Sequence, residues 1–261
     1  MRIVFLALAA VAAQRNSGGL VVVDGDAAAD PHRKRLRTFA LPRSGTVQIR
    51  QVIDTDSIGP GASQWDGGFV LADFIERTSV SIARCAAGGC DLTSRYANAT
   101  VLELGAGAGG LVAIALLNSG AARVLATDGD PAVLDTLDAN IRANTRGSAA
   151  FLGAARLRWD DERDVAAARA TLGLPIDLIV AADVAFRTSD TAALIDAVAA
   201  LSLEARPEIL LAHTFRFWAD DERFLDDLDA RFLRTEVPKA EIHPRAAGGI
   251  PTSLYRLLLR S

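Results

Sequence analysis

A run of small residues after a short apolar stretch constrains this chain more than any other feature. Residues 101–104 read Val-Leu-Glu-Leu, and Gly-Ala-Gly-Ala-Gly-Gly follows at 105–110. This pattern predicts a buried strand, a tight turn and then a helix over 110–118, because glycine allows positive φ angles and leaves backbone N–H groups open to a ligand. The segment therefore predicts the nucleotide-binding corner of an α/β fold.

The glycine spacing alone does not identify the nucleotide. Gly105, Gly107 and Gly110 fit the G-x-G-x-x-G pattern of dinucleotide-binding folds. With Gly109 in place of Gly110, and Glu103 before them, the same run fits the acidic-x-G-x-G-x-G pattern of S-adenosylmethionine (SAM) enzymes. At this point the motif is consistent with either cofactor.

A carboxylate follows the next expected strand. Residues 123–127 are predicted to form a second parallel strand that ends at Asp128, about 20 residues beyond the glycines. A carboxylate at this position can accept hydrogen bonds from the ribose hydroxyls of either cofactor. Asp130, directly before Pro131, is expected to cap the following helix instead.

Two later regions favour SAM. The strand expected over 176–182 delivers Asp183 and Phe186 to its carboxyl end, and an acid followed by an aromatic residue looks like a methyl-acceptor site. The extended runs at 232–237 and 253–259 have no helix between them, which predicts a terminal antiparallel hairpin. A nicotinamide enzyme would have a second mononucleotide-binding half in that place.

The alternation of strands and helices sets the fold class. Five apolar strands separated by helical stretches are predicted at 101–104, 123–127, 156–159, 176–182 and 208–213. Such strands indicate a parallel sheet covered by helices on both faces. With the terminal hairpin, the expected fold is α/β: a Rossmann-like seven-stranded sheet, mostly parallel. Upstream, the residue pattern predicts a half-exposed strand at 47–53 and a helix at 65–78.

Five signatures then follow one another in order. They are Gly-Ala-Ser-Gln-Trp-Asp-Gly-Gly at the start of 61–75, the glycine corner, Leu134 through Asn140 to Asn144, Leu-Arg-Trp-Asp at 157–160 and Asp-Val-Ala-Phe at 183–186. In this order they resemble the family-16 class of seven-β-strand protein lysine methyltransferases, the methyltransferase-like 21 group. The resemblance extends from roughly Phe39 to the C-terminus on this motif-by-motif basis.

The resemblance assigns residues to a cofactor site. Trp65 belongs to a cofactor-covering segment, Glu103 helps to position the amino-acid end of SAM, and Asp128 contacts the ribose. Trp159 would lie beside the adenine as a flat apolar wall, with Asp160 near the exocyclic amine. The predicted cofactor-binding residues are therefore Trp65, Glu103, Gly105, Gly107, Gly109, Asp128, Trp159 and Asp160.

Asp183 and Phe186 are the predicted catalytic residues, with Asp183 helping to align the acceptor amine. The family usually has tyrosine where this chain has Phe186, so a hydroxyl that could orient the acceptor is missing. His213, Arg216, Phe217 and Trp218 follow the fifth strand, where acceptor loops gather, although core or rim packing explains them equally well.

The predicted function is SAM-dependent N-methylation of a lysine on a non-histone protein. A histidine or small-molecule acceptor is the first alternative. A catalytically silent SAM-binding interaction module, suggested by the missing tyrosine, is the second. The Pro-Pro of enzymes that methylate amide or aryl-amine nitrogens is absent after Asp183, which argues against DNA bases and glutamine.

Composition narrows the partners. The 261 residues, 50% of them hydrophobic, suit one domain, expected over 38–261 after a signal-like segment and linker at 1–37. A net charge of −4 offers no broad cationic surface, so a nucleic-acid partner is not expected. Two cysteines and three histidines make a metal site improbable. Residues 1–13 resemble a secretory signal, too short to span a bilayer, whereas the family resemblance implies the cytosol.

Overall fold

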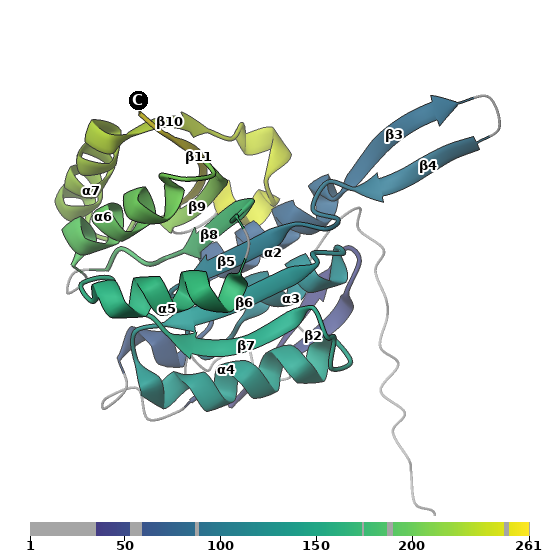
Figure 1. The fold of residues 1–261 in the computed structure, drawn as a ribbon, viewed down its shortest axis with the longest axis horizontal. Helices are drawn as coiled ribbons and strands as arrows, with labels where there is room; N and C mark the ends of the chain where they lie inside the picture. Colours follow the sequence, from purple (N-terminus) through teal and green to yellow (C-terminus); the bar gives the residue numbers. More distant parts are fainter. Residues whose placement is uncertain are drawn as a thin grey trace, which may run out of the picture.

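A seven-stranded sheet runs through the centre of the molecule (Figure 1). The computed structural model describes residues 35–52, 59–86, 89–173, 175–186, 190–247 and 251–260. The strand order is β10-β11-β9-β8-β5-β6-β7, and β11 alone runs antiparallel to its neighbours. The strands are β5 (Thr100–Leu104), β6 (Arg123–Asp128), β7 (Phe151–Arg156), β8 (Leu178–Ala182), β9 (Glu208–Thr214), β10 (Phe232–Glu236) and β11 (Thr252–Leu259).

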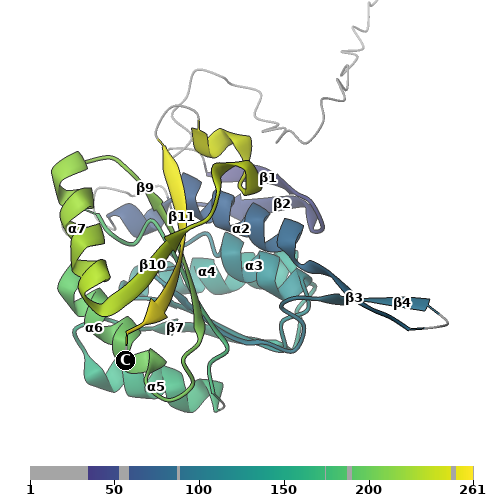
Figure 2. The same ribbon diagram turned by 90° about the horizontal axis from the view of Figure 1, so that it is seen from above.

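Six helices cover the two faces of this sheet. One face packs against α2 (Asp66–Thr78), α3 (Leu111–Asn118) and α4 (Pro131–Asn144). The other packs against α5 (Glu162–Leu172), α6 (Thr191–Ser202) and α7 (Trp218–Arg231), as Figure 2 shows from above. Alternate residues of β5 enter the two cores, Val101 one and Leu102 the other, so the whole strand is buried.

Two hairpins precede the sheet. The N-terminal hairpin pairs β1 (Leu36–Leu41) with β2 (Gly45–Arg50), and its apolar side chains join the same core as α2 and α3. A second hairpin, β3 (Val80–Ala86) with β4 (Gly89–Ser94), extends away from the body of the molecule (Figure 1). Short 3₁₀ helices lie before α2 and between β10 and β11: η2 (Pro60–Ala62), η3 (Lys239–Glu241) and η4 (Pro244–Ala247).

The fold class predicted from the sequence is confirmed, including the antiparallel C-terminal hairpin and the helix predicted over 65–78. The third strand was placed wrongly at 156–159, because β7 covers Phe151–Arg156 and Trp159 lies beyond its end. This strand is at the edge of the sheet and contains Gly-Ala-Ala at its centre, so it lacks the β-branched residues that mark a strand.

The N-terminal expectations are only partly within the described residues. Strand β1 begins at Leu36, two residues before the expected start of the domain at 38, and β2 ends at Arg50, before the expected limit of 53. The signal-like segment at 1–13 lies outside the described residues, and the division at 37 stays a prediction. Within the described ranges, no helix has the length and apolar character that crossing a membrane requires.

Candidate active site

A cavity of about 560 Å³ opens where β5, β6 and β8 end. The chain turns to opposite sides of the sheet between β5 and β8, and open α/β sheets bind ligands at such a point. The volume is in the range of small-molecule and cofactor sites. The lining comes from residues within six segments: 60–68, 103–112, 128–131, 157–160, 182–186 and 190–193.

The glycine turn packs tightly against the segment that leads into α2. Gly107 has a φ of 59°, and a Cβ there would lie 2.8 Å from the carbonyl oxygen of Gly61. At Gly109 a Cβ would collide with Oε1 of Gln64. Ala108, which lies between these two glycines, donates its N–H to the carbonyl of Gly61 at 2.8 Å. Glycine is therefore required at Gly107, where the neighbour is fixed backbone, whereas a side chain at Gly109 would displace the end of the Gln64 side chain.

Glu103 is buried at the end of β5 beneath the glycine turn. Its Oε2 accepts the N–H of Ala113, in the first turn of α3, at 3.0 Å. Gly110, at the N-cap of α3, has no side chain to cap the helix, so Glu103 satisfies one of the free N–H donors of the first turn. Burial, reinforced by the nearby charge of Asp128, raises the pKa of Glu103 to about 8, although the hydrogen bond from Ala113 opposes the shift.

Asp128 ends β6 and faces the same cavity. Its Oδ2 accepts the N–H of Gly107 at 2.8 Å, and its Oδ1 accepts the N–H of Asp130 at 3.0 Å. Burial raises the pKa of Asp128, while these backbone donors pull it down. A carboxylate has about four acceptor sites, so capacity for hydroxyl donors remains. Asp130 caps α4 through the N–H of Ala132, as predicted.

Trp159 and Asp160 lie past the end of β7. The Trp159 ring is half-buried, and with Val184 it closes over Gly105, where φ is 63°. A Cβ at Gly105 would be 3.6 Å from the Trp159 ring and 2.6 Å from Cγ1 of Val184. Asp160 is exposed and accepts two hydrogen bonds from Arg158, which lowers the pKa of its carboxyl. The cavity thus has one flat aromatic wall with a carboxylate at its rim.

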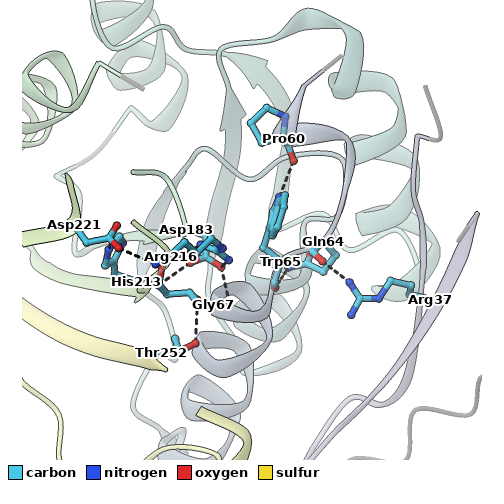
Figure 3. A network of polar contacts seen from close by, with 11 residues as sticks. Arg37, Pro60, Gln64, Trp65, Gly67, Asp183, His213, Arg216, Asp221 and Thr252 are labelled. Atoms are coloured by element: carbon cyan, nitrogen blue, oxygen red, sulfur yellow. Dashed lines mark hydrogen bonds and ion pairs between the residues drawn. The ribbon is translucent and has the colours of Figure 1, made fainter. Parts of the chain in front are cut away.

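Asp183, directly after β8, accepts four hydrogen bonds from three residues, two of them from the Arg216 guanidinium (Figure 3). Its Oδ1 accepts from the N–H of Thr214 at 2.9 Å and from Nη1 of Arg216 at 3.2 Å. Its Oδ2 accepts from the N–H of Gly67 at 2.8 Å and from Nη2 of Arg216 at 3.2 Å. These donors fill the capacity of the carboxylate, and the side chain is 2% exposed. Asp183 lines the cavity, and its oxygens connect α2 to the end of β9.

Aromatic side chains surround the Asp183–Arg216 ion pair. Trp65, directly before α2, donates its Nε1–H to the carbonyl of Pro60 at 2.7 Å. The Arg216 guanidinium lies 4.9 Å from the centre of the Trp65 ring, a cation–π distance. The centre of the Phe186 ring lies 6.3 Å from the centre of the Trp65 ring and 5.6 Å from that of Phe217, which it meets edge-on. The cavity therefore has aromatic walls at the end where Asp183 lies.

A buried His213–Asp221 pair supports the turn that carries Arg216. Nε2 of His213 and Oδ1 of Asp221 are 3.1 Å apart, and Oδ2 of Asp221 accepts the N–H groups of Arg216 and Phe217 at 2.7 Å each. Burial lowers the pKa of His213 despite the neighbouring carboxylate. The sequence placed His213 and Arg216 at this edge without assigning them contacts, and this network supplies them.

Gln64 lines the cavity and was not predicted as a site residue. Its backbone N–H donates to Oε1 of Gln51 at 2.9 Å, its carbonyl accepts from Nη1 of Arg37, and its Nε2 donates to the carbonyl of Trp65. Within the described part of the chain, its Oε1 is a buried oxygen without a hydrogen-bond partner. Gln64 stands in the Gly-Ala-Ser-Gln-Trp signature, but no role was predicted for it, because its place depends on contacts with the distant glycine turn.

The chain is similar to known proteins both in sequence family and in fold. A family model described as lysine methyltransferase matches residues 44–231. No curated protein sequence matches significantly. Within the described ranges, no group of three His, Cys, Asp or Glu residues could hold a metal ion.

Three solved structures are similar to the chain. The SMU.776 protein complexed with SAH has a TM-score of 0.51 at 10% identity, covering 86% of this chain and 56% of that one. A protein from Streptococcus mutans, assigned as a SAM-dependent methyltransferase, gives 0.51 at 10%, covering 87% and 56%. The YcgJ protein from Bacillus subtilis gives 0.47 at 13%, covering 73% and 98%. This chain spans 56% of the first two, and that likeness is one of fold.

Proposed function

Because this chain belongs to the lysine methyltransferase family, we propose that it methylates a lysine side chain of a protein. It is a SAM-dependent methyltransferase by family. The observation that carries the proposal is the cavity at the carboxyl edge, which has a glycine turn and a carboxylate at one end and aromatic walls at the other. The first end suits a nucleoside, and the second suits an aliphatic amine.

The residues of the first end fit SAM. Gly105 and Gly107 line the cavity without side chains, so a ligand can lie against the backbone of the turn, although the N–H groups of residues 106–108 are bonded within the protein. Asp128 retains acceptor sites for ribose hydroxyls. The unpartnered oxygen of Gln64 can accept from an ammonium group, and Trp159 offers a flat face to a purine. We propose that these groups hold SAM together with Trp65, Glu103, Gly105, Gly107 and Asp160, which line the cavity. Gly109 serves the site indirectly, by making room for Gln64.

The protein's part in the reaction is alignment of the acceptor amine. Bound SAM would supply a methyl group on a sulfonium: an amine that has lost its proton to solvent takes the methyl group by in-line displacement, the S–CH3 bond breaks, and S-adenosylhomocysteine leaves. Lysine has a pKa near 10.4 and must be neutral to react, and partial burial disfavours its charged form. Trp65 and Phe186 provide aromatic walls, and alignment by them can lower the barrier without covalent help.

We propose that Asp183 is a positioning residue and does not bind the amine directly. The four hydrogen bonds that Asp183 accepts leave it no lone pair for the amine of the methyl acceptor. Through these bonds Asp183 joins the first turn of α2 to the end of β9. Since Trp65 directly precedes α2, this joint fixes the distance between the two aromatic walls. The sequence-based role for Asp183, alignment of the amine by its charge, is revised accordingly.

The experiment is transfer of isotopically labelled methyl groups from SAM into proteins of a host-cell extract, followed by mass spectrometry of the labelled peptides. We expect label on lysine nitrogen with wild-type protein and strongly reduced label with Asp128→Ala at SAM concentrations near the wild-type Kd. Label confined to small molecules or to histidine would replace the proposed acceptor. SAM binding without conversion to S-adenosylhomocysteine, in extract and in the small-molecule fraction, would indicate a silent binding module.

A further inference from the structure

Two asparagine side chains of α4 continue the hydrogen bonding of β2. Oδ1 of Asn144 accepts the N–H of Gln48 at 3.1 Å, and its Nδ2 donates to the Gln48 carbonyl at 2.9 Å. One turn earlier, Asn140 makes the same pair of bonds with Arg50, at 2.9 and 2.8 Å. Gln48 and Arg50 are alternate residues of β2, so their backbone groups point to one side. The two amides occupy the position of a neighbouring strand.

Only Asn140 reaches further, into the glycine turn. Its Nδ2 also donates to the carbonyl of Ala108 at 2.7 Å, in a buried hydrogen bond. The N–H of Ala108 is bound by the Gly61 carbonyl at 2.8 Å, so both backbone polar groups of this residue are held from outside the turn. Asn140 is 3% exposed and Ala108 is fully buried. Loss of the amide would leave a buried carbonyl unpaired, which favours a shift of the turn.

The neighbouring residue explains why such a shift matters. Gly107, directly before Ala108, donates its N–H to Asp128 at 2.8 Å. A displacement of Ala108 therefore moves the backbone that orients the Asp128 carboxylate. Asp183 follows β8 and Arg216 follows β9, and no hydrogen bond connects them to Asn140 in the described ranges. The effect should fall on the glycine-turn end of the cavity alone.

We propose that Asn140 is a positioning residue of the cofactor site, which fixes the glycine turn through Ala108 and couples it to the β1–β2 hairpin. This inference rests on the proposed placement of SAM at the glycine turn. It makes the hairpin part of the cofactor scaffold, because the same side chain binds β2 and the turn.

Asn144 provides a matched control, since it makes the same two bonds to β2 without the bond to the turn. We expect Asn140→Ala to raise the Kd of SAM by roughly tenfold in calorimetry, with kcat at saturating SAM within about twofold of wild type. Asn144→Ala should leave the Kd within about twofold while weakening attachment of the hairpin. Asn140→Asp, nearly isosteric and still able to accept from Arg50, should resemble Asn140→Ala, and it serves if the alanine variant fails to fold.

Equal Kd values for the Asn140 and Asn144 variants would overturn the inference, as would a loss of kcat with unchanged Kd. Asp128→Ala separates this result from a failure of the premise. If that variant binds SAM as wild type does, the cofactor lies elsewhere and the proposed placement is wrong. If it binds weakly while the two asparagine variants remain equal, the placement holds and only the role of Asn140 is refuted.

Discussion

The two ends of the cavity each have an aspartate at the end of a parallel strand, and the two carboxylates are held in contrasting ways. Asp128 accepts from the N–H groups of Gly107 and Asp130, both of which lie nearby in its own half of the site. Asp183 accepts from two backbone N–H groups and from both terminal nitrogens of Arg216. One carboxylate keeps capacity for a ligand, whereas the other is fully engaged with the protein.

The contrast teaches that position at the sheet edge does not decide the role of an acid. The donors to Asp183 include Gly67, 116 residues away in the sequence, and Thr214, 31 residues away. A carboxylate with such distant partners assembles the site, because it fixes elements that the chain brings together only on folding. Asp128 accepts from Asp130, two residues away, and from Gly107, 21 residues away, and these two backbone donors leave acceptor capacity for a ligand.

The largest test of this contrast is Arg216→Ala. The Arg216 side chain is 13% exposed and that of Asp183 2%, so the substitution leaves a buried carboxylate without its cation. Removing one partner of a buried pair costs about 3–5 kcal/mol. We expect a loss of that size in the free energy of unfolding, measured by urea denaturation. Arg216→Lys keeps the charge but loses the paired geometry and should fall between. If Arg216→Ala lowers the free energy of unfolding by less than about 1 kcal/mol, the Asp183–Arg216 pair does not hold α2 and β9 together.

The counterpart at the other end is Asp128→Ala, with its effect on ligand affinity. Charge-assisted hydrogen bonds contribute roughly 1.5–3 kcal/mol, so the Kd of SAM should rise about ten- to a hundredfold. Stability should change less than in Arg216→Ala. Calorimetry with SAM measures the first effect. Asp161→Ala is the control, because Asp161 also accepts a backbone N–H, from Arg163 at 3.0 Å, but does not line the cavity. Unchanged affinity in folded Asp128→Ala would remove this residue from the site.

Much of the fold could be predicted because its signals are local. Strand β5 is buried on both faces and reads as a continuous apolar run, and Asp130 before Pro131 marks the start of α4. The β3–β4 hairpin was not predicted. Strand β7 was misplaced because, as an edge strand with Gly153 at its centre, it needs few large apolar residues. Edge strands carry a weaker sequence signal than central ones.

The site was predictable to the extent that its residues follow strand ends. Each predicted cofactor residue except Gly109 lines the cavity, and Gly109 packs against Gln64. The sequence could not predict that Asp183 would be saturated or that Asn140 would reach Ala108, because hydrogen bonds between distant segments leave no periodic pattern. The sequence predicted the positions of Asp128 and Asp183, but it did not predict how many hydrogen-bond donors each carboxylate would have.

A third test uses Glu103, which lies beside Asp128 at the glycine-turn end. Its pKa is raised to about 8 in the folded protein against an ordinary value of 4.5, so the folded protein holds a proton there that the unfolded chain loses. Between about pH 4.5 and 8 this group therefore contributes stability that declines as pH rises, by at most about 1.4 kcal/mol per pH unit. His213, with a lowered pKa, acts with the opposite sign as pH rises through its usual range.

Comparison with Glu103→Gln isolates the contribution of Glu103, because His213 and Asp128 titrate in both proteins. Urea denaturation at pH 6 and pH 7 should show wild type losing stability relative to Glu103→Gln across this interval. The glutamine keeps an acceptor for the N–H of Ala113. If stability changes with pH in the same way in both proteins, Glu103 is ionised in the folded protein. Glu103 and Asp128 would then both be charged at this end of the cavity.

The smallest effect is expected for Phe186→Tyr, which probes the aromatic end of the cavity. Phe186 is half-buried between Trp65 and Phe217, and its ring lies in a cavity open enough to line a ligand site. A para hydroxyl there should change stability by less than about 0.5 kcal/mol and single-turnover methyl transfer by less than about threefold, because the walls that align the amine are retained. Phe186→Ala, which removes the wall, is the comparison and should slow transfer more. A gain of tenfold or more with tyrosine would show that the hydroxyl usual in the family orients the acceptor. Alignment by aromatic walls would then be incomplete in this chain, and the two ends of the cavity would resemble each other in depending on a polar group that faces the ligand.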